Sequence, residues 1–146
     1  MRISNKTDYA LRALFALVAS PGDTAVSARE IAEKSKIPRK FLEQIMRELK
    51  EQGVVQSIPG KHGGYRLARP AAEISIGEVV RNFDGLHGPA PCACLDCSAE
   101  TCPHESACHF RWLFVDIRDY AARLLDGATL ESVYRKSVSD RSNEMP

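Results

Sequence analysis

The sequence predicts a mainly α-helical fold: a winged helix-turn-helix with a small β-hairpin wing, then a cysteine-rich loop and a long C-terminal helix. Three observations predict it. Apolar residues recur at helical spacing in the first 51 positions, a Gly-rich turn separates two short extended runs, and all five cysteines fall in one segment. The 146 residues suffice for one compact domain, or for one small domain plus an oligomerising element.

Breaks in composition divide the chain into five expected parts. Residues 1–70 form the winged unit, and 71–91 form a short helix with a linker loop. The cysteine-rich loop is 92–108, and 109–135 hold a long helix with a short one after it. The polar residues 136–146 are expected to be a flexible tail.

The winged unit is expected to contain three helices. The first spans 6–19. The second begins at Ser27, and the spacing between Ser27 and Glu30 is that of a capping box. The third spans 38–51, with Pro38 suited to its first turn. The expected buried faces are Leu11, Leu14, Phe15 and Val18 in the first helix, and Phe41, Leu42, Ile45, Met46 and Leu49 in the third.

Two extended runs follow, at 54–58 and 65–68, and residues 59–64 between them are rich in Gly and Pro. Such a pattern is typical of a β-hairpin. A further short helix is expected over 75–81, with Ser75 as its N-cap. Helix, capped helix, tight turn, helix and hairpin, in that order, describe a winged helix-turn-helix.

Charge divides the chain into unlike halves. Residues 1–70 hold 13 Lys and Arg against 7 Asp and Glu, whereas 71–146 hold 7 against 12. The basic half is therefore suited to a polyanion, and with the motif this favours double-stranded DNA as partner. The alternative is a winged unit that binds another protein. The residues expected to contact DNA are Ser27, Pro38, Arg39, Lys40, Gln44, Lys61, His62, Gly63, Tyr65 and Arg66.

Chemistry assigns roles within that set. Arg39 can bond guanine and Gln44 can read adenine, whereas Lys more often holds a phosphate. At the hairpin tip, Gly63 and its neighbour Gly64 would let the backbone come close to a phosphate.

The long helix, expected over 109–125, carries an apolar stripe that approximates a heptad pattern. Such a stripe favours a homodimer, although packing within one chain would use the same residues. The expected dimer interface is Phe110, Leu113, Phe114, Ile117, Ala121 and Leu124.

Clustered cysteines indicate metal or redox chemistry. Thiolates are soft ligands that suit iron–sulfur clusters, zinc would accept them too, and a metal-free thiol switch is a third alternative. The five residues concerned are Cys92, Cys94, Cys97, Cys102 and Cys108.

Other classes of protein are disfavoured. The chain has neither an apolar run of about 18 to 20 residues nor a signal-peptide core at its start, so we expect a cytoplasmic protein without a membrane partner. It has no P-loop, no dinucleotide-binding glycine motif and no nucleophile elbow, so we do not expect an enzyme. An iron–sulfur redox protein that does not act on DNA is the alternative from another class.

Four stretches, 7–12, 41–45, 60–70 and 76–80, closely resemble the iron–sulfur cluster regulator (IscR/NsrR/RirA-like) family. With the cysteine loop and the long helix, the resemblance covers residues 1 to 135. It implies a homodimeric winged-helix transcription factor, expected to act as a repressor, with the long helix as dimer contact. It also implies a [2Fe-2S] or [4Fe-4S] cluster that controls DNA binding.

The resemblance further implies a ligand set. Cys92, Cys102 and Cys108 match the family's three cysteine ligands, with Cys94 and Cys97 as alternatives because the first spacing is longer than in typical members. Where IscR-like proteins have a histidine ligand, this chain has Arg111. Another branch of the family uses an N-terminal aspartate from the partner chain, which would be Asp8 here, and His104 and His109 are local alternatives.

Overall fold

The computed structural model describes residues 3–20, 24–85 and 108–143, with side chains as far as 140. Four of the five cysteines, Cys92, Cys94, Cys97 and Cys102, lie outside the described residues, as does His104. The elements in order are α1 (Asn5–Val18), α2 (Ala28–Ser35), α3 (Arg39–Glu51), β1 (Val55–Ile58), β2 (Gly64–Leu67), η1 (Ala71–Glu73), α4 (Ile76–Asp84), α5 (Arg111–Gly127) and α6 (Leu130–Asn143).

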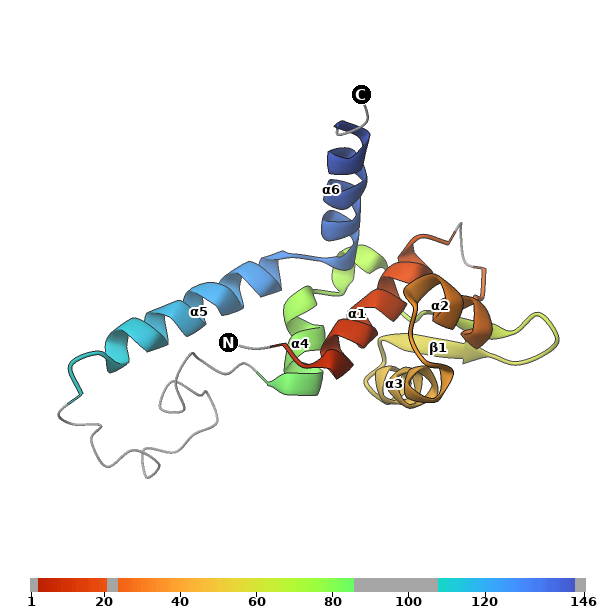
Figure 1. Cartoon of the computed structure of the whole chain (residues 1–146), viewed down its shortest axis with the longest axis horizontal. Helices are drawn as coiled ribbons and strands as arrows, with labels where there is room; N and C mark the ends of the chain where they lie inside the picture. Colours follow the sequence, from red (N-terminus) through yellow and green to blue (C-terminus); the bar gives the residue numbers. More distant parts are fainter. Residues whose placement is uncertain (1–2, 21–23, 86–107, 144–146) are drawn as a thin grey trace.

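The predicted fold class is confirmed. Three helices and an antiparallel hairpin form one packed body, from which α5 extends in one direction and the hairpin in the other (Figure 1). Helix α6 follows α5: its first residue, Leu130, is buried in the core, and its C-terminal end projects away from the body (Figure 1). No helix of the described residues is long and apolar enough to cross a membrane.

Helix α1 lies at the centre of the body and contacts α2, α3, α4 and α6. Its fully buried face is built from Ala10, Ala13 and Leu14, whereas Leu11 and Phe15 are only partly buried. The sequence therefore predicted the correct helix with its buried face rotated. Alanine side chains are small, so they let neighbouring helices approach the α1 backbone closely.

The helix-turn-helix is fixed by three local features. Ser27 caps α2 by accepting a hydrogen bond from the Glu30 N–H at 3.2 Å. Lys36 ends α2 in the left-handed conformation, with φ of 54°. This turns the chain sharply and brings Ile37 into the core, where it is 4% exposed.

One residue of the expected core is outside it. Phe41 was predicted on the buried face of α3, but its side chain is 58% exposed, and that prediction is wrong. The buried positions of α3 are Leu42, Ile45, Met46 and Leu49. Because a helix turns about 100° per residue, Phe41 falls on the flank of the face centred on these four.

The hairpin is joined to the rest of the body by backbone pairing. Val26, in the link between α1 and α2, exchanges two hydrogen bonds of 2.8 Å with Tyr65 of β2. A Cβ at Gly64 would lie 2.1 Å from the Val26 carbonyl oxygen, and one at Gly63 would lie 2.1 Å from the Ile58 carbonyl oxygen. Both glycines are therefore required by packing within the chain.

The last helices differ most from expectation. Helix α5 begins at Arg111, two residues later than predicted, and within the described structure none of its residues is buried. The tail predicted as flexible from residue 136 is wrong for 136–143, which continue α6 to Asn143. The sequence of that segment is polar because the helix is mostly exposed, and a polar exposed helix resembles a tail when only apolar periodicity is counted.

Candidate nucleic-acid interface

The N-terminus of α3 is open to solvent. Pro38 occupies the N-cap position, and among the described residues no side chain caps this helix. Its first residues, Arg39 and Lys40, are exposed. The free N–H groups and the helix dipole make such an end favourable for a phosphate, and the two cations add to that preference.

Beyond this turn, α3 presents a continuous outer face. Lys40, Gln44 and Arg47 recur at spacings of four and three, which places them one above another. Arg47 was missed by the sequence reading, although its position seven residues after Lys40 signals the same face. A shallow hollow of about 460 Å³ is lined by Lys40, Glu43, Gln44, Arg47, Glu48 and Glu51.

Two of the acidic residues of this face, Glu43 and Glu48, are paired with basic ones. Arg39 Nε lies 3.1 Å from Glu43 Oε1, and Lys6 Nζ of α1 lies 2.7 Å from Glu48 Oε2. Exposed pairs of this kind are worth roughly 0.2–1 kcal/mol. Arg39 can therefore exchange Glu43 for a phosphate or a base at little cost.

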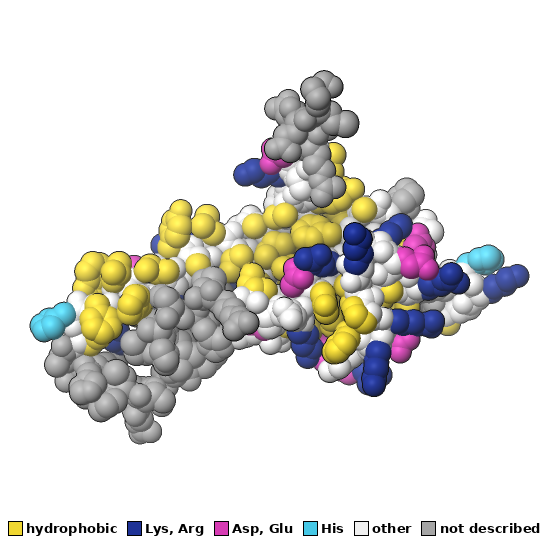
Figure 2. Space-filling view, viewed as in Figure 1, with side chains coloured by type: hydrophobic (Ala, Val, Ile, Leu, Met, Phe, Trp, Pro, Cys, Tyr) yellow, Lys and Arg dark blue, Asp and Glu magenta, His cyan; other side chains and the backbone are white. Residues whose placement is uncertain are grey.

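The hairpin carries the second basic group. Lys61 and His62 are exposed at its tip, and basic and histidine side chains mark that end of the molecule in Figure 2. More dark blue side chains gather over the rest of the winged unit in this view, whereas α5 is mostly yellow (Figure 2). In this view the basic side chains therefore lie mainly on the winged unit (Figure 2).

The remaining residues predicted to contact DNA have other contacts. Ser27 is exposed but caps α2, and Tyr65 is half-buried against the core. Arg66 is paired with Gln56 across the hairpin and lines a cavity of about 750 Å³ that also borders α6. The structure therefore brings Arg39, Lys40 and Gln44 together on α3, places Lys61 and His62 on the wing, and separates Arg66 from the wing tip.

Helix α5 presents an apolar stripe to solvent. Leu113, Ile117, Tyr120 and Leu124 recur at helical spacing and are each at least 43% exposed. Phe110 extends the stripe and packs edge-to-face on Phe114, which is half-buried. Tyr120 was absent from the predicted interface, which had Ala121 at the next position instead. A continuous apolar stripe on an exposed helix is typical of an interaction surface.

The candidate metal ligands are only partly within the described residues. Cys108 is a free, half-buried thiol three residues before α5, and Asp8 lies in the first turn of α1, with its carboxylate 2.8 Å from Arg12 Nε. Arg111 occupies the first position of α5 and is half-buried. No group of three His, Cys, Asp or Glu that could hold a metal occurs among the described residues. The donor chemistry of Cys108 fits a thiophilic metal or cluster.

Comparisons with known proteins agree with this geometry. A family model named Rrf2, described as an iron-dependent transcriptional regulator, matches residues 3–136. A curated relative from Rhodobacter capsulatus, an rrf2-like HTH-type transcriptional regulator, is 38% identical over 90% of this chain and 91% of its own length.

Two solved structures are similar over nearly the whole chain. CymR, the global cysteine regulator of B. subtilis, has a TM-score of 0.75 and is 29% identical over 93% of this chain and 98% of its own. IscR of T. potens has a TM-score of 0.73 and is 25% identical over 100% of this chain and 93% of its own.

Proposed function

The chain belongs to the Rrf2 family of DNA-binding transcriptional regulators, and from that premise we propose that it acts as a homodimer whose operator binding is controlled at the cysteine-rich segment. The proposal that α3 recognises DNA is supported by its open N-terminus and by one exposed face that holds Lys40, Gln44 and Arg47. In a helix-turn-helix, this end of the second helix enters the major groove. The wing tip, with Lys61 and His62, then lies on the adjoining backbone.

The apolar stripe of α5 supports the homodimer. Leu113, Ile117, Tyr120 and Leu124 would cover one another between two copies of α5. Two winged units held by one helix pair would then read half-sites about one helical turn of DNA apart, because a two-fold axis fixes their spacing. A shift of α5 would therefore change the spacing of the two winged units and, with it, the affinity for the operator.

The control site is proposed at the segment that enters α5. Cys92, Cys102 and Cys108 would hold an iron–sulfur cluster, with Cys94 and Cys97 as alternative first ligands and Asp8 of the second copy as candidate fourth ligand. Such a cluster supplies sensitivity to iron, oxidant or nitric oxide. Cys108 lies three residues before α5, so a change in its bonding acts close to where the dimer helix begins.

A second candidate for control is a metal-free thiol switch. It is favoured by the similarity to a solved oxidised form of S. aureus CymR, which is 29% identical to this chain. Zinc held by the same thiolates is the remaining alternative.

The test of DNA reading compares three lysine and arginine truncations on α3. Lys40→Ala and Arg47→Ala are expected to lower affinity for random-sequence duplex DNA and to reduce the salt dependence by about one unit of slope per lost phosphate contact. Lys50→Ala is the matched control, since Lys50 is exposed at the far end of the helix. Equal effects of all three variants would contradict entry of α3 by its N-terminal end.

The test of control begins with anaerobic purification and measurement of iron, sulfide, zinc and free thiols. Iron with matching sulfide, lost in Cys108→Ser, is the expected result. Zinc alone would overturn the cluster, and so would five titratable thiols without metal. In either case the DNA-binding assignment stands and the thiol or zinc alternative replaces the cluster.

A further inference from the structure

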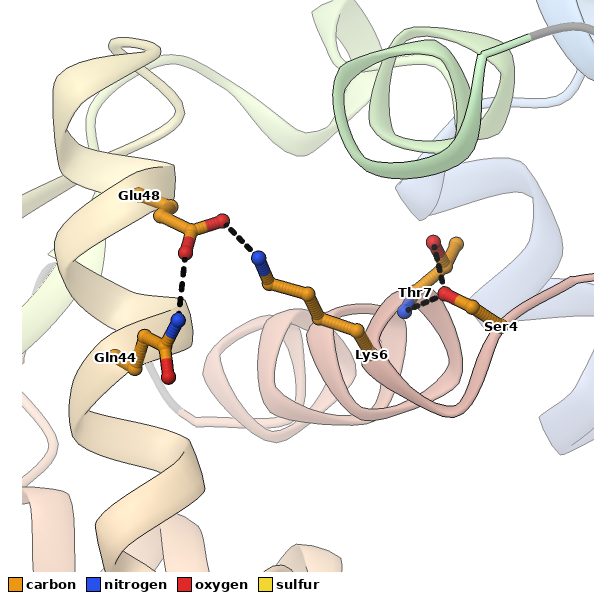
Figure 3. Close-up of polar contacts among 5 residues, drawn as sticks. All are labelled: Ser4, Lys6, Thr7, Gln44 and Glu48. Carbon is orange, nitrogen blue, oxygen red and sulfur yellow. Dashed lines mark hydrogen bonds and ion pairs between the residues drawn. The ribbon is translucent and has the colours of Figure 1, made fainter.

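Three side chains from two helices form a continuous polar chain beside the DNA-reading face. Lys6 Nζ of α1 lies 2.7 Å from Glu48 Oε2, and Glu48 Oε1 accepts a hydrogen bond from Gln44 Nε2 at 3.3 Å (Figure 3). Each oxygen of the Glu48 carboxylate therefore has its own partner. The last side chain of this series is Gln44, whose amide is proposed to contact a base.

This arrangement determines which way the Gln44 amide faces. An ionised carboxylate only accepts hydrogen bonds, so Glu48 holds the amide nitrogen and turns the amide oxygen away, as Figure 3 shows. The second hydrogen of Gln44 Nε2 remains available for another acceptor. Gln44 therefore presents one acceptor and one donor, in a fixed order, on the exposed face of α3.

A fixed order of acceptor and donor discriminates between purines. Adenine offers the N6 amino group as donor and N7 as acceptor in the major groove, which matches a Gln amide held in one orientation. Guanine offers two acceptors, O6 and N7, and leaves the Gln oxygen facing an acceptor. Such an amide favours adenine.

Lys6 is itself held in place by the end of α4. Its ammonium lies 5.5 Å from the centroid of the Phe83 ring, within the range of a cation–π contact. The start of α1 is fixed to the same helix end, because the Ser4 N–H donates to Asp84 Oδ2 at 2.8 Å. Ser4 also accepts from the Thr7 N–H and so caps α1 (Figure 3).

We propose that Lys6 and Glu48 are positioning residues that preset the amide of Gln44 and thereby specify adenine at one operator position. The proposal rests on the proposed function, in which Gln44 contacts a base. Neither Lys6 nor Glu48 needs to touch DNA for this role. With side chains 42% and 27% exposed, the pair is partly shielded from solvent and restricts the amide without burying it.

The experiment selects binding sites for the full-length protein from a random-sequence duplex library and compares base preferences among variants. Gln44→Ala is expected to reduce the adenine-over-guanine preference at one position by roughly five- to 100-fold. Glu48→Ala, which frees the amide to turn, is expected to reduce the same preference by roughly three- to tenfold. Lys6→Met is expected to have a smaller effect of roughly two- to threefold, because exposed ion pairs are weak.

Two control variants separate orientation from charge. Glu51→Ala removes a carboxylate that lines the same hollow but has no hydrogen bond to Gln44, and it is expected to leave the base preference unchanged. Lys6→Arg keeps the ion pair and is expected to retain the wild-type preference.

The outcomes distinguish the two levels of the proposal. If Gln44→Ala changes no base preference, the assignment of Gln44 as a base-reading residue fails. If Gln44→Ala abolishes the adenine preference but Glu48→Ala leaves it intact, Gln44 reads the base and the positioning role is overturned. A loss of preference in Glu48→Ala equal to that in Glu51→Ala would also overturn it, since charge alone would then explain the effect.

Discussion

The winged unit and α5 are stabilised in different ways. Among the described residues, every buried apolar side chain except Leu130 lies between Ala10 and Val80. Helix α5 contributes no buried residue, although it carries some of the largest apolar side chains of the chain. The winged unit, together with α4, therefore completes its core within one chain. The exposed stripe of α5 indicates a surface that is completed by a second molecule.

The largest expected effect is on the core. Leu14→Ala removes a fully buried side chain from α1 and is expected to lower the free energy of unfolding by about 2–5 kcal/mol. Leu124→Ala, at a position 57% exposed in the single chain, is the matched truncation on α5. Urea unfolding at several protein concentrations distinguishes the stability loss in Leu14→Ala from that in Leu124→Ala.

Concentration dependence distinguishes the two regions because only association depends on it. We expect the loss in Leu14→Ala to be similar at all concentrations. The loss in Leu124→Ala should appear mainly where the wild-type protein is dimeric. A concentration-independent loss of similar size in both variants would remove the distinction between the two regions.

The next effect concerns the stripe itself. Leu113→Glu would place an unpaired carboxylate in an apolar interface and is expected to weaken self-association by roughly 100-fold or more, about 2.7 kcal/mol. Trp112→Glu introduces the same group at an exposed apolar residue beside the stripe, whose indole N–H donates to the His109 carbonyl. Sedimentation equilibrium measures both. Dissociation of both variants, or of neither, would contradict a dimer built on this stripe.

The way the winged unit is stabilised explains which of its features could be predicted from the sequence. Within the winged unit, apolar periodicity and the caps Ser27 and Ser75 predicted the helices correctly, because burial and capping both depend on local sequence. The orientation of α1 was missed, since its buried face is mostly Ala and alanine contributes little to an apolar pattern. Phe41 was misplaced for the converse reason: a large apolar residue next to a buried face was counted as part of it.

The candidate site was predictable from the sequence where its residues lie on a single helix or on the hairpin. Arg39, Lys40 and Gln44 follow from the start of α3, and Lys61 and His62 from the turn of the hairpin. The contact between Lys6 and Glu48 was not predictable, because it joins residues 42 positions apart on two helices whose crossing is set by the core. The cysteine ligands stay a prediction, since Cys92, Cys94, Cys97 and Cys102 lie outside the described residues.

The junction between the two regions provides a third test. A Cβ at Gly77 of α4 would lie 2.1 Å from Asp126 Oδ1 and 3.1 Å from the Asp126 backbone nitrogen. Gly77→Ala is therefore expected to displace the end of α5 and the Asp126 carboxylate from Arg81, its ion-pair partner. We expect a loss of about 1–3 kcal/mol in unfolding free energy.

The double variant Gly77→Ala with Asp126→Ala separates the two causes of that loss. Removing the Asp126 side chain relieves the nearest clash, so the second substitution should cost less in the Gly77→Ala background than in the wild type. Strictly additive losses would show that the side chain of Asp126 does not limit the approach of α5 to α4.

The smallest expected effect is at the cap of α4, which joins the winged unit to the later helices. The Ser75 hydroxyl accepts from the Glu78 N–H at 3.0 Å, so Ser75→Ala leaves that donor without its cap and should cost about 1 kcal/mol. Ser137→Ala is the matched change within exposed α6, where the serine hydroxyl donates to the Tyr134 carbonyl at 2.8 Å. Alanine has the higher helix propensity there, so this variant should be neutral or slightly more stable. If thermal unfolding gave equal losses for both serines, the cap of α4 would contribute no more than an exposed position of α6, and the winged unit would not depend on local capping at its boundary.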